Sequence, residues 1–192
     1  MADGIRAVLL GAPGSGKGTQ ADRLASVLGV PAISTGELLR RAVTAGTPLG
    51  RKVGEVMAAG RLVDDALMAE VVRERLMSRD ARGGFLLDGY PRTPPQAETL
   101  DEILADRDQK LDAVVYLDVP EEILVRRALA RRRADDREEV VRERLRVYRE
   151  STEPLVGHFE GRGLLRRVDG DRPMDEVTRG ILAALGRNGQ WC

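Results

Sequence analysis

The sequence has little of several residue types, and each shortage excludes a class of protein. One cysteine, Cys192, and one histidine, His158, stand among 192 residues. These counts exclude a disulfide framework, a cysteine-rich zinc site and a cysteine nucleophile within the fold, and they suit a reducing compartment. No apolar run approaches the length of a membrane span, and the first strand begins so close to Met1 that a signal peptide has no room. We therefore expect a cytoplasmic protein with no zinc and no membrane contact.

The chain also lacks a net charge, which limits its partners. Lysine plus arginine and aspartate plus glutamate are equal at 31 each, so nothing in the balance favours nucleic acid or an acidic membrane. Lysine occurs at 17, 52 and 110, and the other basic residues are arginines, whose planar guanidinium suits phosphate. A length of 192 residues provides a sufficient core for one domain. We predict a single domain over residues 1–192, with basic groups that act locally.

Short apolar runs alternate along the chain with segments of helical periodicity. The runs occupy residues 5–10, 31–33, 85–87, 113–117 and 164–168. Runs that are apolar throughout fit strands covered on both faces, and their alternation with helices predicts a doubly wound, five-stranded parallel sheet. Ser34 has Glu37 three residues later, which is the spacing of a capping box at the start of the next helix.

The region between the second and third strands is longer than a strand–helix–strand unit requires. Three helical stretches, at 37–45, 49–58 and 65–79, stand where one would be enough. The surplus predicts a second, movable substrate subdomain over residues 34–63. A short break in helical periodicity over residues 131–138 predicts a lid, with a plain helix–helix turn as the alternative.

The strongest motif follows the first apolar run. Residues 11–19 read Gly-Ala-Pro-Gly-Ser-Gly-Lys-Gly-Thr, the glycine-rich turn that binds phosphates through backbone N–H groups, a helix N-terminus and a lysine. An ordinary strand-to-helix turn is the alternative, but Gly11, Gly16 and Lys17 together favour phosphate binding. Gly18 stands where a hydroxyl usually follows the lysine, so the hydroxyl comes one place later, at Thr19.

A second motif ends the third apolar run. Residues 85–93 read Phe-Leu-Leu-Asp-Gly-Tyr-Pro-Arg-Thr, and Gln96 follows three residues later. In a doubly wound sheet Asp88 would end a buried strand beside the phosphate loop, where a carboxylate can hold hydrated Mg²⁺. A helix N-cap or a turn aspartate is the alternative, and the phosphate loop favours magnesium, bound through water.

Three arginines stand out by their positions on predicted helices. Arg127 and Arg131 are four residues apart, so they share one face of a helix and can point into the same cleft. Arg144 interrupts an otherwise apolar stripe, which favours an anionic partner for it. A surface arginine whose stem lies along apolar neighbours is the alternative.

These motifs, taken together, resemble adenylate kinase in order and across nearly the whole chain. The segments are GAPGSGKGTQ from residue 11, ISTGELLR from 33, DGYPRT from 88 with its glutamine, and RADD from 133. The chain is similar to the short-lid form of the family. The resemblance implies transfer of the terminal phosphoryl group of Mg·ATP to AMP, giving two ADP. It also implies a core, an AMP-binding subdomain and a lid that close over the substrates, and we expect a monomer.

The resemblance assigns residues to each substrate. For ATP it implies Gly14, Ser15, Gly16, Lys17, Gly18, Thr19, Arg127, Arg131 and Arg172. For AMP it implies Thr35, Arg40, Met57, Arg61, Leu62, Val63, Gly89, Arg92, Gln96, Arg133 and Arg144. The residues expected to act on the phosphates during transfer are Lys17, Asp88, Arg92, Arg127, Arg133 and Arg144. In so short a lid, Arg132 could take the role of Arg133.

Other acceptors and other classes of protein are the remaining alternatives. The resemblance implies that Thr35, Thr93 and Gln96 select the acceptor. A pyrimidine-monophosphate kinase would be expected to carry alanine near Thr35 and asparagines near Thr93 and Gln96, whereas glutamine presents both a donor and an acceptor to adenine. A P-loop switch or motor ATPase would need a hydroxyl directly after Lys17. A nucleic-acid binder using the arginines of 126–149 would need a face of one sign, yet acidic residues are interleaved there. We expect ATP, AMP and ADP as partners, and no nucleic acid.

Overall fold

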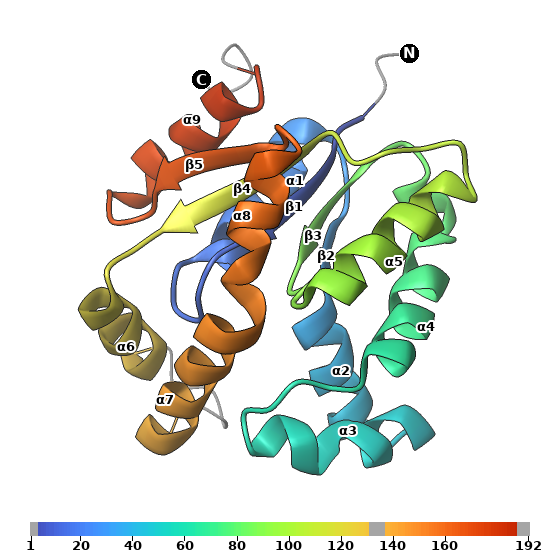
Figure 1. The fold of residues 1–192 in the computed structure, drawn as a ribbon, viewed down its shortest axis with the longest axis vertical. Helices are drawn as coiled ribbons and strands as arrows, with labels where there is room; N and C mark the ends of the chain where they lie inside the picture. The colour runs from blue at the N-terminus through green and yellow to red at the C-terminus, as the bar shows by residue number, and fades with distance from the viewer. Residues whose placement is uncertain (1–3, 131–136, 188–192) are drawn as a thin grey trace.

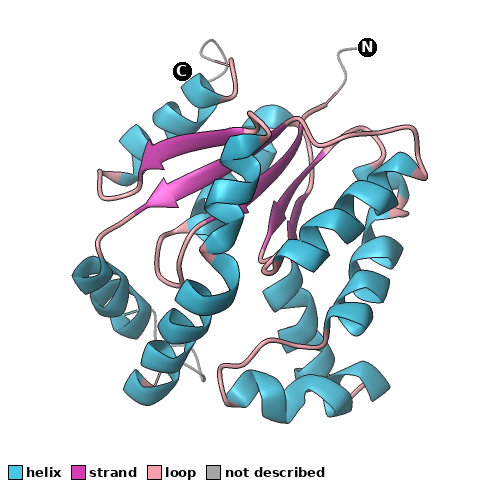
Figure 2. Cartoon of the chain, in the orientation of Figure 1, coloured by secondary structure: helices cyan, strands magenta, loops and turns pink. Residues whose placement is uncertain are grey.

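Parallel strands form one five-stranded sheet in the computed structural model, which describes residues 4–130 and 137–187. The sheet order is β2-β3-β1-β4-β5. The strands are β1 (Arg6–Leu10), β2 (Ala32–Ser34), β3 (Phe85–Asp88), β4 (Ala113–Asp118) and β5 (Leu165–Asp169). Each strand lies where an apolar run predicted one, so the doubly wound parallel sheet is confirmed (Figure 2).

Helices connect the strands and cover both faces of the sheet (Figure 1). They are α1 (Lys17–Leu28), α2 (Thr35–Thr44), α3 (Pro48–Ala58), α4 (Asp65–Leu76), α5 (Pro94–Ala105), α6 (Glu121–Ala130), α7 (Glu138–Val147), α8 (Pro154–Gly161) and α9 (Met174–Ala184). Alternate residues of a strand point to opposite faces. In β1, Val8 and Leu10 enter a core with α4, α5 and α8, whereas Ala7 and Leu9 enter a core with α1 and α9. Burial on both faces explains why the central strands are apolar throughout.

A third, smaller core anchors α6 and α7 to the turn after β1. Ala12 of that turn packs in one cluster with Leu124 and Ala128 of α6 and with Val141 and Leu145 of α7. These residues are all buried. The two helices that flank residues 131–136 therefore rest on the phosphate loop itself.

The three helices predicted between the second and third strands are present as α2, α3 and α4. Thr47 caps α3 by accepting a hydrogen bond from the backbone N–H of Gly50 at 3.1 Å. Gly50 also permits α3 to lie against α2, because a Cβ there would come within 2.1 Å of the carbonyl oxygen of Ala42. Figure 1 shows α2 and α3 at one end of the molecule, beyond the ends of β2 and β3.

The predicted capping box at the start of α2 is wrong, although the helix begins at that point. Ser34 is the N-cap residue, but its hydroxyl donates to Oδ2 of Asp88, at 3.2 Å, and makes no cap hydrogen bond. Glu37 instead accepts hydrogen bonds from Arg40 and Arg41, both at 3.2 Å. Ser34 therefore links two adjacent strands of the sheet.

Candidate functional site

A cavity of about 970 Å³ lies at the carboxyl edge of the sheet. Its walls come from the loop after β1, the start of α2, the end of β3, the turn after α3, and α7. Doubly wound sheets bind their ligands at this edge. The volume is at the upper end of the range for small-molecule sites, which is about 300–1,000 Å³.

The structure brings most of the predicted site residues to the wall of this cavity. They are Gly14, Ser15, Gly16, Lys17, Gly18, Thr19, Thr35, Arg40, Met57, Arg61, Leu62, Val63, Asp88, Gly89, Arg92, Gln96, Arg127, Arg144 and Arg172. Arg131, Arg132 and Arg133 lie outside the described residues, and so does most of the predicted lid. The last two lid positions, Arg137 and Glu138, are the N-cap and the first residue of α7.

The phosphate loop holds its lysine close to its own backbone. Nζ of Lys17 donates to the carbonyl oxygens of Gly11 at 2.7 Å and Ala12 at 3.0 Å, and lies 3.4 Å from Oγ of Ser15. The N-cap of α1 is Gly16, which has no side chain to occupy the first N–H groups, and the first turn carries no acidic residue. The first N–H groups of a helix and its dipole favour an anion at such an N-terminus.

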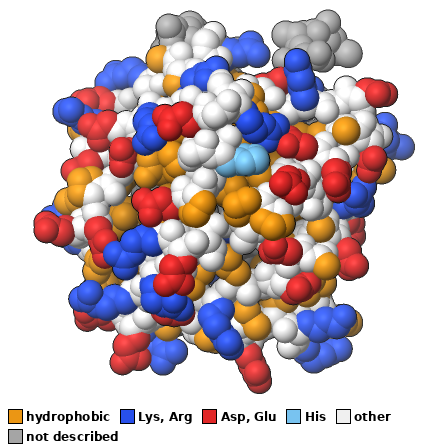
Figure 3. Space-filling model, in the orientation of Figure 1, with side chains coloured by type: hydrophobic (Ala, Val, Ile, Leu, Met, Phe, Trp, Pro, Cys, Tyr) orange, Lys and Arg blue, Asp and Glu red, His pale blue; other side chains and the backbone are white. Residues whose placement is uncertain are grey.

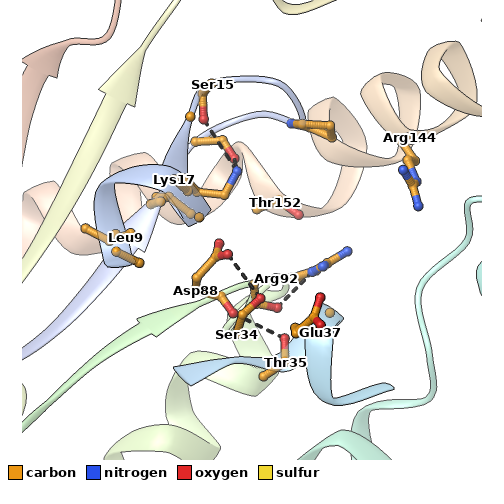
Figure 4. Close-up of a pocket in the computed structure, with 18 of the residues that line it drawn as sticks. Leu9, Ser15, Lys17, Ser34, Thr35, Glu37, Asp88, Arg92, Arg144 and Thr152 are labelled. Carbon is orange, nitrogen blue, oxygen red and sulfur yellow. Dashed lines mark hydrogen bonds between the residues drawn. The ribbon is translucent and has the colours of Figure 1, made fainter. Parts of the chain in front are cut away.

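Asp88 ends β3 beside the phosphate loop. It pairs in register with Leu9 of β1 and with Ser34 of β2. A Cβ at Gly18 would lie 3.7 Å from Oδ2 of Asp88, so the carboxylate faces the first turn of α1. Figure 4 shows it pointing toward the loop that carries Ser15 and Lys17.

This donor set fits Mg²⁺ held through water. Magnesium keeps several waters in proteins and is usually bound by one or two carboxylates together with phosphate oxygens. Asp88 provides one half-buried carboxylate next to the phosphate loop. Across residues 4–130 and 137–187, no group of three or more His, Cys, Asp or Glu side chains could hold a metal ion. A cation at Asp88 would thus take most of its ligands from water and phosphate.

Two guanidinium groups, of Arg40 and Arg92, mark a second anion position. Burial lowers the pKa of Arg92; the Asp88 carboxylate opposes that shift and the neighbouring Arg40 cation adds to it. Nε of Arg92 donates to the carbonyl oxygen of Gly89 at 2.8 Å. Gly89 has φ +85°, and a Cβ there would lie 2.7 Å from Oγ1 of Thr35 and 3.2 Å from the Arg92 guanidinium. Both guanidinium groups line the same cavity, where an anion can accept hydrogen bonds from them.

A hydrogen-bond network fixes the side chain of Gln96 at the start of α5. Oε1 of Gln96 accepts from the backbone N–H of Arg92 at 2.8 Å, and Nε2 donates to Oδ1 of Asp65 at 2.6 Å. Thr93, which we expected beside the bound acceptor, donates to Oδ2 of Asp65 at 3.1 Å and caps α5. Thr93 therefore belongs to this network and not to the cavity wall.

Two further arginines, Arg127 and Arg172, line the cavity and are paired with residues at the end of β5 and just after it. Arg127 donates to the carbonyl oxygen of Gly170 at 2.8 Å and to Oδ1 of Asp171 at 3.0 Å. Arg172 donates to Oδ2 of Asp169 at 2.7 Å, and that hydrogen bond raises the pKa of Arg172. Asp169, which ends β5, and Asp171, in the loop that follows, thus position the two cations.

Arg144 reaches the cavity from α7, as Figure 4 shows. It is half-buried, and its neighbours Val140, Val141 and Tyr148 are buried, which confirms the apolar stripe that it interrupts. The turn at Gly60, after α3, packs directly against it. A Cβ at Gly60 would lie 3.3 Å from Cγ of Arg144. The side chain of Arg144 therefore leaves the stripe at the point where the α2–α3 region meets α7.

The sequence did not single out several residues that the structure places at the site. Ser34 was read as a helix cap, yet its hydroxyl contacts Asp88. The sequence places Asp65 only in a helical stretch; in the structure it lies behind the cavity wall and accepts hydrogen bonds from Thr93 and Gln96. Thr152 is buried on the cavity wall and ends a π-helical turn, Tyr148–Thr152, between α7 and α8. No motif in the sequence indicates that turn, whereas π-helical turns are frequent at functional sites.

The surface in Figure 3 carries acidic and basic side chains side by side. In α7, Arg142 donates to Glu138 at 2.8 Å, and Arg146 pairs with both Glu143 and Glu150. Because these opposite charges are paired, α7 does not present the uniformly positive surface that nucleic-acid binding needs. Within the described residues, no helix has both the length and the hydropathy to cross a membrane.

Comparison with known proteins places these features in context. The family described as adenylate kinase matches residues 9–164. An adenylate kinase of Xanthomonas euvesicatoria pv. vesicatoria is 54% identical over 187 residues, covering 95% of this chain and 100% of that protein. An adenylate kinase of Thermobifida fusca is 52% identical, covering 94% of this chain and 98% of that protein. An adenylate kinase of Thermus thermophilus is also 52% identical, covering 95% of this chain and 98% of that protein.

Proposed function

The chain belongs to the adenylate kinase family of phosphotransferases, and we propose that its cavity transfers the terminal phosphoryl group of ATP to AMP, giving two ADP. The observation that carries this proposal is the presence of two anion positions in one cavity. The phosphate loop with Lys17 forms one position, and the guanidinium groups of Arg40 and Arg92 form the other. Each suits the phosphates of one nucleotide.

We assign the donor, ATP, to the phosphate loop. The backbone of residues 14–19, the N-terminus of α1 and the ammonium of Lys17 would bind its phosphates. Arg172 lies in the loop after β5, and Arg127 contacts Gly170 and Asp171 of that loop, so the two arginines line neighbouring parts of the cavity. We propose that Arg127, together with Arg131, contacts the triphosphate and that Arg172 lies near the adenine.

We assign the acceptor, AMP, to the wall formed by α2, the turn after α3 and the segment after β3. Arg40 and Arg92 would bind its phosphate beside Thr35 and Gly89. Gln96 would hydrogen-bond the adenine edge. Met57 and residues 61–63 would contact the base and ribose, so residues 34–63 would form an AMP-binding subdomain.

The difficulty of this reaction is electrostatic, since an ionised phosphate oxygen of AMP needs no general base. Two unit charges about 4 Å apart repel by about 4 kcal/mol at an intermediate dielectric. Lys17, Arg92 and Arg144 line the cavity at positions that would offset this repulsion, and Arg133 would add to them. Hydrated magnesium, held at Asp88 when bound, supplies further neutralisation of phosphate charge.

We further propose that the protein acts as a cytoplasmic monomer that maintains the balance of adenine nucleotides. The described walls of the cavity all come from this one chain. We also propose that residues 131–138 act as a short lid, which would exclude water and so protect ATP from hydrolysis.

The test is a coupled assay that measures ADP formation from ATP with AMP, CMP, UMP or GMP as the acceptor. We expect rapid turnover with AMP, slow turnover with the other three, and two ADP for each ATP consumed. ATP consumption without an acceptor would favour an ATPase. A preference for CMP or UMP would favour a pyrimidine-monophosphate kinase.

A further inference from the structure

We propose that Asp65 determines base selectivity by fixing the direction of the Gln96 side-chain amide. This inference rests on the proposed binding of the acceptor base at Gln96. Asp65 does not line the cavity, so it would act as a positioning residue through Gln96.

A glutamine amide has one accepting end and one donating end, and rotation by half a turn exchanges them. At Gln96 each end faces a group of fixed polarity. The backbone N–H of Arg92, which can only donate, lies 2.8 Å from Oε1. The carboxylate of Asp65, which accepts, lies 2.6 Å from Nε2. If the amide rotated by half a turn, its N–H groups would face the N–H of Arg92 and its oxygen would face the carboxylate of Asp65. Both hydrogen bonds would then be lost.

Asp65 is itself held in place. Its second oxygen, Oδ2, accepts a hydrogen bond from the Thr93 hydroxyl at 3.1 Å. Asp65 is the first residue of α4, where the helix dipole favours a negative charge. The preceding residue, Asp64, caps the helix by accepting from the backbone N–H groups of Ala66 and Leu67. The carboxylate that faces Gln96 therefore sits on a fixed support.

The locked amide still has hydrogen-bonding capacity for a ligand. Gln96 is only 3% exposed, yet it contributes to the cavity wall. Each of its two ends has capacity beyond the bond it makes, since an amide has two N–H donors and two oxygen lone pairs. The oxygen can accept from the amino group of adenine while the second N–H donates to the adjacent ring nitrogen.

This direction distinguishes two purines of almost the same shape. Along the edge that would face Gln96, adenine presents its amino group, a donor, and then a ring nitrogen, an acceptor. The hypoxanthine of IMP presents a carbonyl oxygen, an acceptor, and then a ring N–H, a donor. Only a rotated amide would match IMP. A site built to hydrogen-bond one pattern rejects the other strongly, because the wrong ligand leaves buried polar groups unpaired. The structure thus assigns to Asp65 the discrimination of AMP from IMP.

The test compares kcat/KM for AMP and for IMP, with ATP as donor, in the wild type and in three variants. Asp65→Ala removes the accepting carboxylate, and Asp65→Asn keeps its shape while adding a donor. We expect the AMP-to-IMP ratio to fall about tenfold in Asp65→Ala and by a smaller factor in Asp65→Asn, the size expected for one lost hydrogen bond. The change should appear mainly in KM, because Asp65 touches no reacting atom.

Asp64→Ala is the matched control. It removes the cap of the same helix one residue away, so it should lower the melting temperature and leave the AMP-to-IMP ratio unchanged. An unchanged ratio in both Asp65 variants would overturn the proposal, as would an equal fall in Asp64→Ala. Loss of folded protein in both Asp65 variants, read by circular dichroism, would assign Asp65 to the fold and not to selectivity. Failure of the wild type to use AMP would instead contradict the proposed function.

Discussion

Nζ of Lys17 lies 2.7 Å from the carbonyl oxygen of Gly11, so the loop that begins the site already holds its own cation. The ammonium group is half-buried at the first residue of α1. Hydrogen bonds to neutral carbonyls are weaker than hydrogen bonds to charged phosphate oxygens. A phosphate can therefore take over the ammonium without a large movement of the loop.

Replacement of this lysine should remove activity and leave the fold intact. We expect Lys17→Met to lower the rate of ADP formation by about a hundredfold to a thousandfold, the effect of losing one positioned donor to a charged transition state. Methionine retains the length and the helix propensity of the side chain. Lys52→Met, an exposed change on α3, is the control and should keep full activity. Undiminished ADP formation by Lys17→Met would discard the phosphate site.

Two glycines of the phosphate loop should respond differently to a methyl group. Gly14 and Gly16 both have positive φ, +91° and +96°, so alanine is strained at either position, by about 1–3 kcal/mol. A Cβ at Gly14 would also lie 2.4 Å from the carbonyl oxygen of Leu124 in α6, whereas at Gly16 nothing lies within 4 Å. Gly14→Ala should therefore lower the free energy of unfolding more than Gly16→Ala. Urea titration measures both values, and equal losses would contradict the tight contact with α6.

The contact between Gly60 and Arg144 should couple the α2–α3 region to the site. Gly60 has φ +73°, and a Cβ there would lie 3.2 Å from the carbonyl oxygen of Val140 and 3.3 Å from Cγ of Arg144. Gly60→Ala should cost about 1 kcal/mol of stability through backbone strain and should lower kcat by displacing Arg144.

Gly46→Ala separates these two effects. Gly46 has φ +63°, but a Cβ there would have no neighbour within 4 Å. This variant should lose similar stability and keep its kcat. If both variants keep the wild-type kcat, Arg144 does not depend on the packing at Gly60.

Acid should weaken the ion pair between Arg75, near the end of α4, and the exposed carboxylate of Asp80. Hydrogen bonds from Arg75, and then from Ser78, lower the pKa of Asp80 from its ordinary value of 3.8 to about 2. A lowered pKa means that the pair stabilises the fold above about pH 4 and that this stabilisation is lost as the pH falls through about 2. The difference in unfolding free energy between wild type and Asp80→Asn should therefore shrink between about pH 5 and about pH 2, and it should be small because the pair is exposed. A difference that stays constant over this range would contradict the assignment.

Local sequence patterns predicted the sheet because burial acts on each strand separately. The run Ala113–Leu117 is apolar because both of its faces are covered, and it became β4. The phosphate loop could also be predicted, because its glycines and lysine fall within one short segment, residues 11–17. By contrast, Ser34 has the spacing of a local cap, but its hydroxyl bonds to Asp88, which is distant in sequence.

The network around Gln96 could not be predicted from spacing. Asp65 and Gln96 belong to different helices, α4 and α5, and a pair of polar residues so far apart carries no pattern in one sequence. The resemblance to the family places Thr93 at the acceptor. The structure directs its hydroxyl to Asp65, because that carboxylate lies at the adjacent helix start.

Simultaneous binding of two different nucleotides tests the central claim most directly. Isothermal titration calorimetry would measure the binding of AMP to the protein saturated with Mg²⁺ and an ATP analogue whose terminal phosphoryl group cannot be transferred. We predict one analogue and one AMP bound per chain at the same time, with the AMP site lost in Arg92→Ala and the analogue site weakened in Lys17→Met. Competition between the two ligands for a single site would contradict the account.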